Sequence, residues 1–107
     1  MDAIIGTTSK HNKEIRLTAE RWAHIVESHD YMTGNQDVVL ETLESPDIIV
    51  GGTKDERIAI KRYAKTSISE KHAVGIYNEQ EIDGFVIAAF MTSKPGKITK
   101  KGVEWKM

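Results

Sequence analysis

The chain has 107 residues, with 15 Lys and Arg, 16 Asp and Glu, and no Cys. Its length allows one domain with a single core, and its formal net charge of −1 excludes global electrostatic attraction to nucleic acid or a membrane, so any such partner must bind a local patch. The absence of Cys excludes disulfides, zinc–thiolate sites and thiol chemistry, and it fits a reducing compartment.

Residues 1–13 are expected to form a polar lead-in that is flexible or includes an edge strand, and residues 14–107 to form the single domain. No apolar run approaches the roughly 20 residues of a membrane span. The lead-in also lacks the apolar core and cleavage signal of a secretory peptide. We therefore expect a cytoplasmic protein that does not bind membranes.

The first predicted element after the lead-in is an amphipathic helix capped by Thr18. Trp22, Ile25, Val26 and His29 recur at the spacing of one helical face, which should be directed to the core. The turn-like residues 30–35 end this helix. A second helix then begins near residue 35 or 37 and ends at residues 45–46, where Pro stops it.

The hydrophobic period becomes strand-like after the second helix. Strands are predicted at residues 48–50, 57–65, 72–77 and 82–92. Helices followed by an antiparallel meander indicate an α+β domain, with two N-terminal helices on one face of a roughly four-stranded antiparallel sheet.

The strand at residues 57–65 alternates apolar and basic side chains. Arg57, Lys61 and Lys65 lie on one side with Tyr63 between them, which suits phosphate binding and base stacking. Alternating charge is equally typical of the solvated face of any antiparallel sheet, so both interpretations stay open.

His24 and His29 are the candidate proton-transfer residues, because imidazole titrates near neutral pH. Cleavage of RNA through its 2′-hydroxyl needs a proton acceptor, a proton donor, and cations or hydrogen-bond donors around the phosphorus. Helical geometry separates these two side chains by roughly 140°, so they should not face one ligand squarely. His29 ranks above His24 because it lies near the helix C-terminus, where the macrodipole favours the imidazolium.

Both histidines also have a structural interpretation, as hydrogen-bonded core or capping residues. Their spacing is not that of a helical metal pair and no third ligand is evident, so no metal site is predicted. His11 and His72 are interpreted as solvated residues. At the end of the last long strand, the Thr92 hydroxyl is suited to a phosphate oxygen, or it is an ordinary strand-end group.

Several short motifs together resemble a known family. They are Leu17 and Thr18, then Glu20, Arg21 and Trp22, then His24 and Ile25, then His29, SPDI at residues 45–48, RYAK at residues 62–65, FVIAAFMT at residues 85–92, and Lys94. Their order and spacing resemble the small phage and bacterial members of the barnase, EndoU, colicin and RelE-like nuclease superfamily, over residues 13–105.

The resemblance implies a cofactor-free, metal-independent endoribonuclease that cleaves RNA through its 2′-hydroxyl, often as a toxin or phage-conflict effector with a protein antitoxin or immunity partner. Its functional positions fall on His24 and His29, on a basic residue of the strand at residues 57–65, taken as Lys61, and on Thr92. The predicted substrate-binding residues are Arg57, Arg62, Tyr63, Lys65, Ser93 and Lys94.

The sequence departs from the family pattern at two positions. Asp30 follows His29 where such members often have Pro, and Phe90 stands where Tyr is common. Asp30 either holds the imidazolium of His29 or marks a site that has drifted. The alternative function is a catalytically inactive module of the same fold that binds RNA or a protein, which the near-zero net charge favours slightly.

Overall fold

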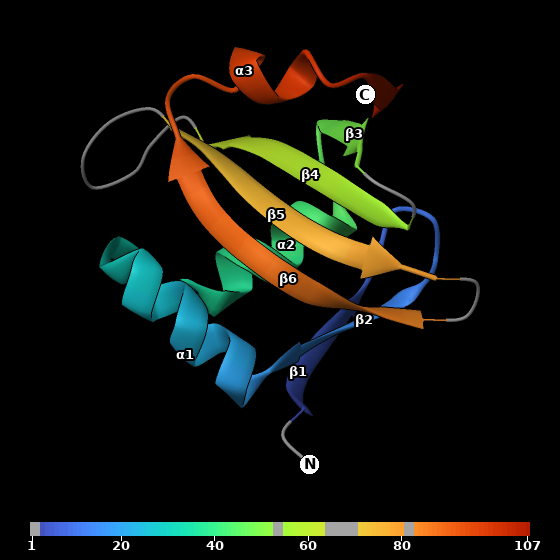
Figure 1. The fold of residues 1–107 in the computed structure, drawn as a ribbon. Helices are drawn as coiled ribbons and strands as arrows, with labels where there is room; N and C mark the ends of the chain where they lie inside the picture. Colours follow the sequence, from blue (N-terminus) through green and yellow to red (C-terminus); the bar gives the residue numbers. More distant parts are fainter. Residues whose placement is uncertain (1–2, 53–54, 64–70, 81–82) are drawn as a thin grey trace.

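The computed structural model describes residues 3–52, 55–63, 71–80 and 83–107. Its strands are β1 (Ala3–Thr8), β2 (Glu14–Thr18), β3 (Ile48–Gly51), β4 (Glu56–Tyr63), β5 (Lys71–Glu79), β6 (Asp83–Thr92) and β7 (Val103–Lys106). Its helices are α1 (Ala19–Ser28), the 3-10 turn η1 (Asp30–Met32), α2 (Gln36–Glu44) and α3 (Gly96–Thr99). The α+β class and the position of two helices before the longest strands are confirmed (Figure 1).

The predicted four-stranded antiparallel sheet is wrong. Within the described residues the sheet has seven strands, in the order β1-β2-β6-β5-β4-β3-β7, and β2 pairs with β6 in parallel. The prediction missed β2 because its five residues precede the helix directly. Ile15 and Leu17 alternate there with more exposed side chains, and both are fully buried.

The segment at residues 3–8 is the edge strand β1, which forms an antiparallel hairpin with β2. The hairpin turn places Asn12 at a positive φ of 65°. Asn tolerates this backbone region better than most residues, because its short side chain forms local hydrogen bonds.

Helix α1 begins as predicted, with the Thr18 side chain accepting a hydrogen bond from the Arg21 backbone N–H at 3.1 Å. The helix ends at Ser28, and His29 is the C-cap residue instead of part of the predicted helical face. Helix α2 follows with Asn35 at its N-cap and lies against β5, β4 and β1.

Apolar side chains are buried on both faces of the sheet. The core shared with α1 and α2 contains Ile15, Leu17, Ile25, Met32, Val39, Leu43, Ala59, Tyr77, Val86 and Ala89. A second cluster contains Val50, Ile58, Ile60 and Val74, and Ile98 of α3 packs against it. Figure 1 shows α3 on the opposite side of the sheet from α1 and α2.

The sheet curves around α2, so its two ends approach one another. Lys10 in the β1–β2 turn has its Nζ 4.8 Å from the ring centroid of Trp105 in β7. Because β7 pairs with β3, this cation–π contact joins elements from opposite edges of the sheet. Neither α3 nor β7 was predicted from the sequence.

Strand β6 is paired on both sides only at its start. β2 pairs with residues 83–85, whereas β5 accompanies β6 from residue 84 to residue 92. Gly84 is required at this start, because a Cβ there would lie 1.8 Å from the carbonyl oxygen of Asn78. Beyond Phe85, the edge of β6 away from β5 is not paired with another described strand.

Candidate active site between α1 and β6

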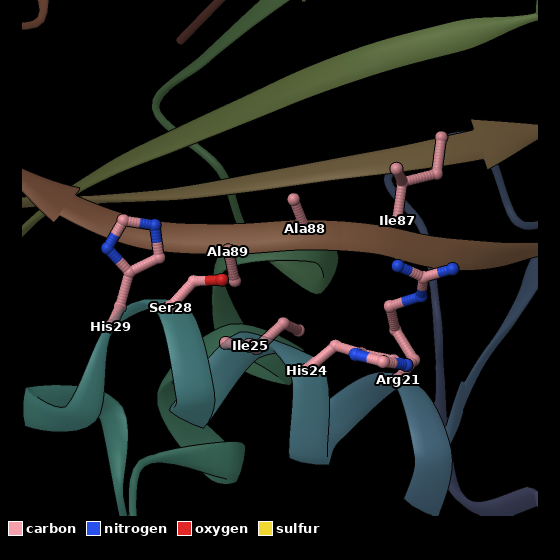
Figure 2. A pocket seen from close by; sticks show the side chains of 8 residues that line it. All are labelled: Arg21, His24, Ile25, Ser28, His29, Ile87, Ala88 and Ala89. Carbon is pink, nitrogen blue, oxygen red and sulfur yellow. The ribbon is translucent and has the colours of Figure 1, made fainter.

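A pocket of about 130 Å³ lies between α1 and the unpaired edge of β6 (Figure 2). Polar side chains from the helix and its C-cap face apolar residues of the strand. The lining residues are Arg21, His24, Ile25, Ser28, His29, Ile87, Ala88 and Ala89. The pocket therefore combines an apolar wall with imidazole, guanidinium and hydroxyl groups.

Helix α1 contributes one continuous face to the pocket. Arg21, His24 and Ser28 follow the i, i+3, i+7 spacing that places side chains on the same side of a helix. Ile25 lies beside them and is buried, so it anchors this face against the strand. Arg21 and Ser28 were not predicted as site residues.

His24 and His29 line the same pocket, although helical geometry predicted that they would diverge. The angle expected between two residues of one helix does not apply to this pair, because His29 has φ −139° and ψ 79° and lies past the last helical residue. Figure 2 shows the His29 ring at one end of the pocket and Arg21 at the other, with His24 between them along α1.

The His29 ring is held by two aromatic neighbours. Its centroid lies 5.6 Å from that of Tyr31 and 5.7 Å from that of Phe90. Its Nδ1 lies 3.3 Å from the Tyr31 hydroxyl oxygen. In the described part of the chain Asp30 forms no ion pair with His29, so the polar partner of this imidazole is Tyr31.

The hydrogen bonds of Tyr31 bear on which ring nitrogen of His29 carries the proton. The Met91 backbone N–H donates to the Tyr31 Oη at 3.1 Å, and the hydroxyl donates to the Met91 carbonyl oxygen at 3.5 Å. A hydroxyl donates one hydrogen bond and accepts two. All three contacts are therefore satisfied when His29 Nδ1–H donates to Tyr31, which leaves Nε2 as the nitrogen available for proton transfer.

The same contacts define which backbone groups of β6 point toward the pocket. Tyr31 binds both the N–H and the carbonyl of Met91, so both groups point away from β5. In an antiparallel pair this direction repeats every second residue, and the register continues without a shift from Met91 to Ala89. The N–H of Ala89, a lining residue, is therefore directed to the open edge of β6.

The pocket is electrostatically positive at its Arg21 end. Arg21 is exposed and forms no ion pair among the residues that the structure describes. No acidic side chain lines the pocket. An anion entering it would meet a guanidinium and imidazole nitrogens without a competing carboxylate in the lining.

The residues predicted at the end of β6, Thr92, Ser93 and Lys94, are not among the residues that line this pocket. Thr92 directly follows Met91, whose backbone binds Tyr31. Its Oγ1 accepts a hydrogen bond from the Lys94 N–H at 3.1 Å, which closes the turn after the strand. Ser93 and Lys94 are exposed.

The predicted basic residues of β4 are held elsewhere. Arg57, Lys61 and Tyr63 share the sheet side of Ala59, which packs in the core with α2. Lys61 Nζ donates to the Ser45 carbonyl at 3.0 Å, and Arg57 Nε lies 2.9 Å from a carboxylate oxygen of Glu104. None of the three lines the pocket.

Tyr63 is tied to α2, because its hydroxyl donates to the Glu41 carboxylate. Burial raises the pKa of the Tyr63 phenol well above its ordinary value, and the neighbouring Glu41 raises it further. Tyr63 is therefore a neutral structural contact at physiological pH. Lys65, the remaining predicted member of this basic face, lies outside the described residues.

A row of polar side chains crosses the other side of the sheet. Arg62 pairs with His72, and His72 pairs with Thr92, on the neighbouring strands β4, β5 and β6. Directly opposite side chains in such pairs have Cβ atoms about 4.5–5.5 Å apart. His72 Nδ1 is buried and has no hydrogen-bond partner among the described residues, so the solvated interpretation of His72 is incomplete.

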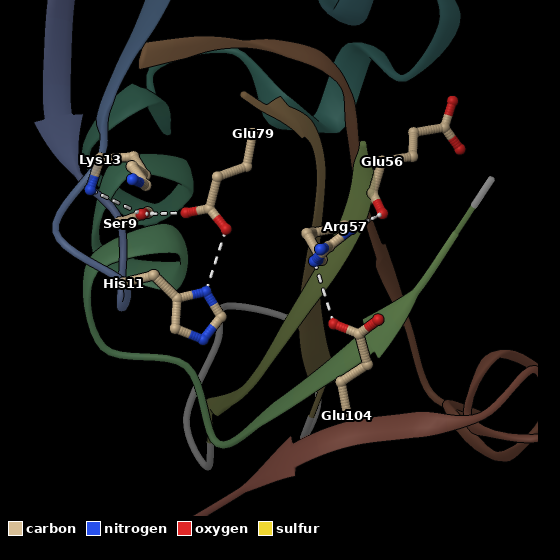
Figure 3. A network of polar contacts seen from close by, with 7 residues as sticks. All are labelled: Ser9, His11, Lys13, Glu56, Arg57, Glu79 and Glu104. Carbon is tan, nitrogen blue, oxygen red and sulfur yellow. Dashed lines mark hydrogen bonds and ion pairs between the residues drawn. The ribbon is translucent and has the colours of Figure 1, made fainter. Parts of the chain in front are cut away.

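A second histidine cluster lies at the opposite end of β6 (Figure 3). The buried Glu79 carboxylate accepts a hydrogen bond from Ser9, and its other oxygen lies 3.0 Å from His11 Nδ1. The carboxylate separates the hydroxyl from the imidazole, whereas a nucleophilic serine needs the imidazole next to it. This cluster therefore fastens the β1–β2 turn to β5.

Comparison with protein-family models, curated proteins and solved structures finds no match. Among the described residues, none of the helices combines the length and the apolar character of a membrane span. Nor do three or more His, Cys, Asp or Glu side chains of those residues gather as they would around a metal ion.

Proposed function

We propose that the protein is a metal-independent endoribonuclease whose scissile phosphate binds in the pocket between α1 and β6. The observation that carries this proposal is the presence of His24, His29 and Arg21 in one pocket without an acidic lining residue. Two imidazoles can accept and donate protons near neutral pH, and the guanidinium is a permanent cation for a phosphate.

In the proposed reaction, the ribose 2′-oxygen loses its proton to one imidazole and attacks the phosphorus. The bond from phosphorus to the 5′-oxygen breaks, and the second imidazole donates a proton to this leaving oxygen. The products are a 2′,3′-cyclic phosphate end and a 5′-hydroxyl end. His29 is proposed as the donor through Nε2, because Tyr31 occupies its Nδ1.

Charge that develops on the phosphate oxygens needs donors already in position. Arg21 supplies a charged donor, and the edge N–H of Ala89 supplies a backbone donor. Such preorganised groups stabilise a transition state without reorganisation. The Ser28 hydroxyl lines the same pocket and can bind a further oxygen.

The size of the pocket bears on substrate selection. Its volume of about 130 Å³ is smaller than the roughly 300 Å³ at the lower end of sites that enclose drug-sized ligands. We therefore expect a phosphate and its attached oxygens to enter while the bases stay outside. Cleavage should then depend weakly on base identity.

The proposal is tested by incubating purified protein with end-labelled single-stranded RNA in the presence of EDTA. Fragments that end in 2′,3′-cyclic phosphate support it, and a matched DNA strand, which lacks the 2′-hydroxyl, should stay intact. Intact RNA at high protein concentration would contradict it. RNA binding without cleavage would then favour the inactive binding module.

A toxin role is a further part of this proposal. Expression in a bacterial host should slow growth, and a neighbouring gene that encodes an antitoxin or immunity protein should relieve the defect. A host that grows equally well with wild-type protein and with His29→Ala would argue against toxicity.

A further inference from the structure

The region after β6 is one of two strongly basic stretches of the chain, and the other is residues 57–65. Residues 94–101 contain four Lys and no Asp or Glu, so the remaining residues hold 11 basic and 16 acidic side chains, a net charge of −5. A protein with almost no net charge therefore carries a short cationic segment, while the charges of its other residues sum to a negative value. We call Lys94, Lys97, Lys100 and Lys101 the lysine segment.

The fold presents this segment to solvent. Lys97, Lys100 and Lys101 are three and four residues apart on α3 and the turn that continues it, so they share one side. Ile98 is half-buried and packs against Val74 and its neighbours in the second core cluster. The apolar side of α3 is thus directed to the sheet and the lysines are directed outward.

None of these lysines is neutralised within the described part of the chain. All four side chains are exposed, and none takes part in an ion pair there. Unpaired lysines held close together repel one another, and a bound polyanion relieves this repulsion. Its electrostatic free energy of binding should therefore be more favourable here than at scattered surface charges.

The lysine segment also follows β6, the strand that lines the pocket, directly in the chain. Ala89 lines the pocket, Thr92 ends β6, and Lys94 is bound to Thr92 through its backbone N–H. α3 then runs over the sheet face opposite α1, as Figure 1 shows. A chain molecule held in the pocket can therefore extend past the end of β6 to the lysines.

We propose that the lysine segment binds the phosphates of a single-stranded RNA on one side of the scissile bond. The inference rests on the proposed function, since it assigns a second part of the same substrate. Lysines contact phosphates as point charges without reading bases, so the segment should add affinity without sequence preference. An anionic membrane fits less well, because a membrane-binding helix exposes the apolar side that α3 buries.

The test measures binding separately from cleavage. A fluorescent oligonucleotide with 2′-O-methyl riboses cannot be cleaved through the 2′-oxygen, so its dissociation constant can be measured by anisotropy at several salt concentrations. In Lys97→Gln/Lys101→Gln, we expect weaker binding and a slope of log affinity against log salt that is flatter by about 1.4, for two lost contacts on a single strand.

The matched control is Gln36→Glu/Gln80→Glu, which lowers the net charge by the same amount at residues outside the segment. It should keep the wild-type slope. An unchanged slope in the lysine variant, or an equal flattening in the control, would overturn the proposal. Tighter binding to phosphatidylserine vesicles than to the oligonucleotide would also overturn it in favour of a membrane surface.

Separate results would contradict the proposed nuclease function and the proposed role of the lysine segment. If the wild-type protein cleaves no RNA while the lysine variant still loses the salt-dependent binding, the binding surface stands and the nuclease assignment falls. If His29→Ala abolishes cleavage and keeps the wild-type affinity for the uncleavable strand, both stand. If the wild type and the lysine variant bind the oligonucleotide equally, the proposed role of the lysine segment is wrong, and the proposed nuclease function is unaffected.

Discussion

The two histidine clusters at opposite ends of β6 contain similar side chains in different arrangements. Gly84 pairs with Glu79 beside one cluster and Met91 contacts Tyr31 beside the other, about 20 Å away along the strand. His11 contacts a buried carboxylate that is already bonded to Ser9, whereas His29 contacts a hydroxyl and keeps its Nε2 toward a pocket. The partner of each ring nitrogen, more than the residue type, thus distinguishes the structural role of His11 from the proton-transfer role proposed for His29.

Replacement of the histidines gives the largest expected difference between the two clusters. His29→Ala should lower the initial rate of RNA cleavage by roughly 10² to 10⁴, because it removes the proposed proton-transfer group. His11→Ala should leave the rate per folded molecule unchanged. Circular dichroism must show that both variants are folded. Equal cleavage rates in the two variants would contradict the different roles assigned to His29 and His11.

Glu79 should affect stability instead of catalysis. Glu79→Ala leaves the buried Ser9 hydroxyl without its acceptor, which should lower the free energy of unfolding by about 1–3 kcal/mol. Urea denaturation measures this loss, and Glu79→Gln, which keeps one acceptor oxygen, should lose less. A fall in cleavage by folded Glu79→Ala protein would show that the two ends of β6 are coupled.

Tyr31→Phe sharpens the assignment of Tyr31 as a positioning residue. It keeps the ring and removes the acceptor for His29 Nδ1–H, a loss of about 1 kcal/mol, or roughly a fivefold lower rate. We expect the change in kcat with little change in KM, together with altered ¹⁵N shifts of the His29 ring. Unaltered shifts would show that the hydroxyl does not hold the imidazole.

Replacement of Tyr77, near Glu79, should have the smallest effect on stability at neutral pH. Its hydroxyl is buried without a hydrogen-bond partner among the described residues, and burial, followed by the Glu79 charge, raises the pKa of the phenol. The folded state thus keeps a proton that the unfolded chain releases above a pH of about 10, so stability falls as the pH rises beyond that value. Tyr77→Phe should change the free energy of unfolding by less than about 1 kcal/mol at pH 7.

The alkaline range provides the check for Tyr77. Urea denaturation between neutral and alkaline pH should show a shallower loss of stability in Tyr77→Phe than in the wild type, by up to about 1.4 kcal/mol per pH unit. Tyr63, whose pKa is raised as well, should keep part of the loss in both proteins. Identical slopes would mean that Tyr77 ionises with little cost in the folded state.

Much of the fold could be predicted from hydrophobic period. α1, α2 and the strands from β3 to β6 have long or strongly patterned apolar faces, and Thr18 caps α1 as expected. β7 could not be found this way, because its side chains are mostly exposed and its place depends on backbone pairing with β3. The parallel β2–β6 pair joins residues far apart in the chain, which local pattern cannot report.

The residues that α1 contributes to the candidate site could be predicted from the sequence, but those that follow the helix could not. The spacing of Arg21, His24 and Ser28 was available in the sequence, and attention to histidines alone missed the first and last of these residues. The angle between His24 and His29 was mispredicted because the helix ends one residue before His29. Tyr31 carries no sequence signal, since its role depends on the unpaired edge of β6.

The way the pocket is closed has a consequence for synthesis of the chain. Arg21 and His24 are made early, but the opposite wall consists of residues 87–89, and β6 takes its place only with β5 already formed. Domains fold as units while they leave the ribosome. A growing polypeptide therefore has no finished pocket until more than four-fifths of these 107 residues have been translated. Under the proposed function, a partly made chain should then leave the ribosome's own RNA uncut.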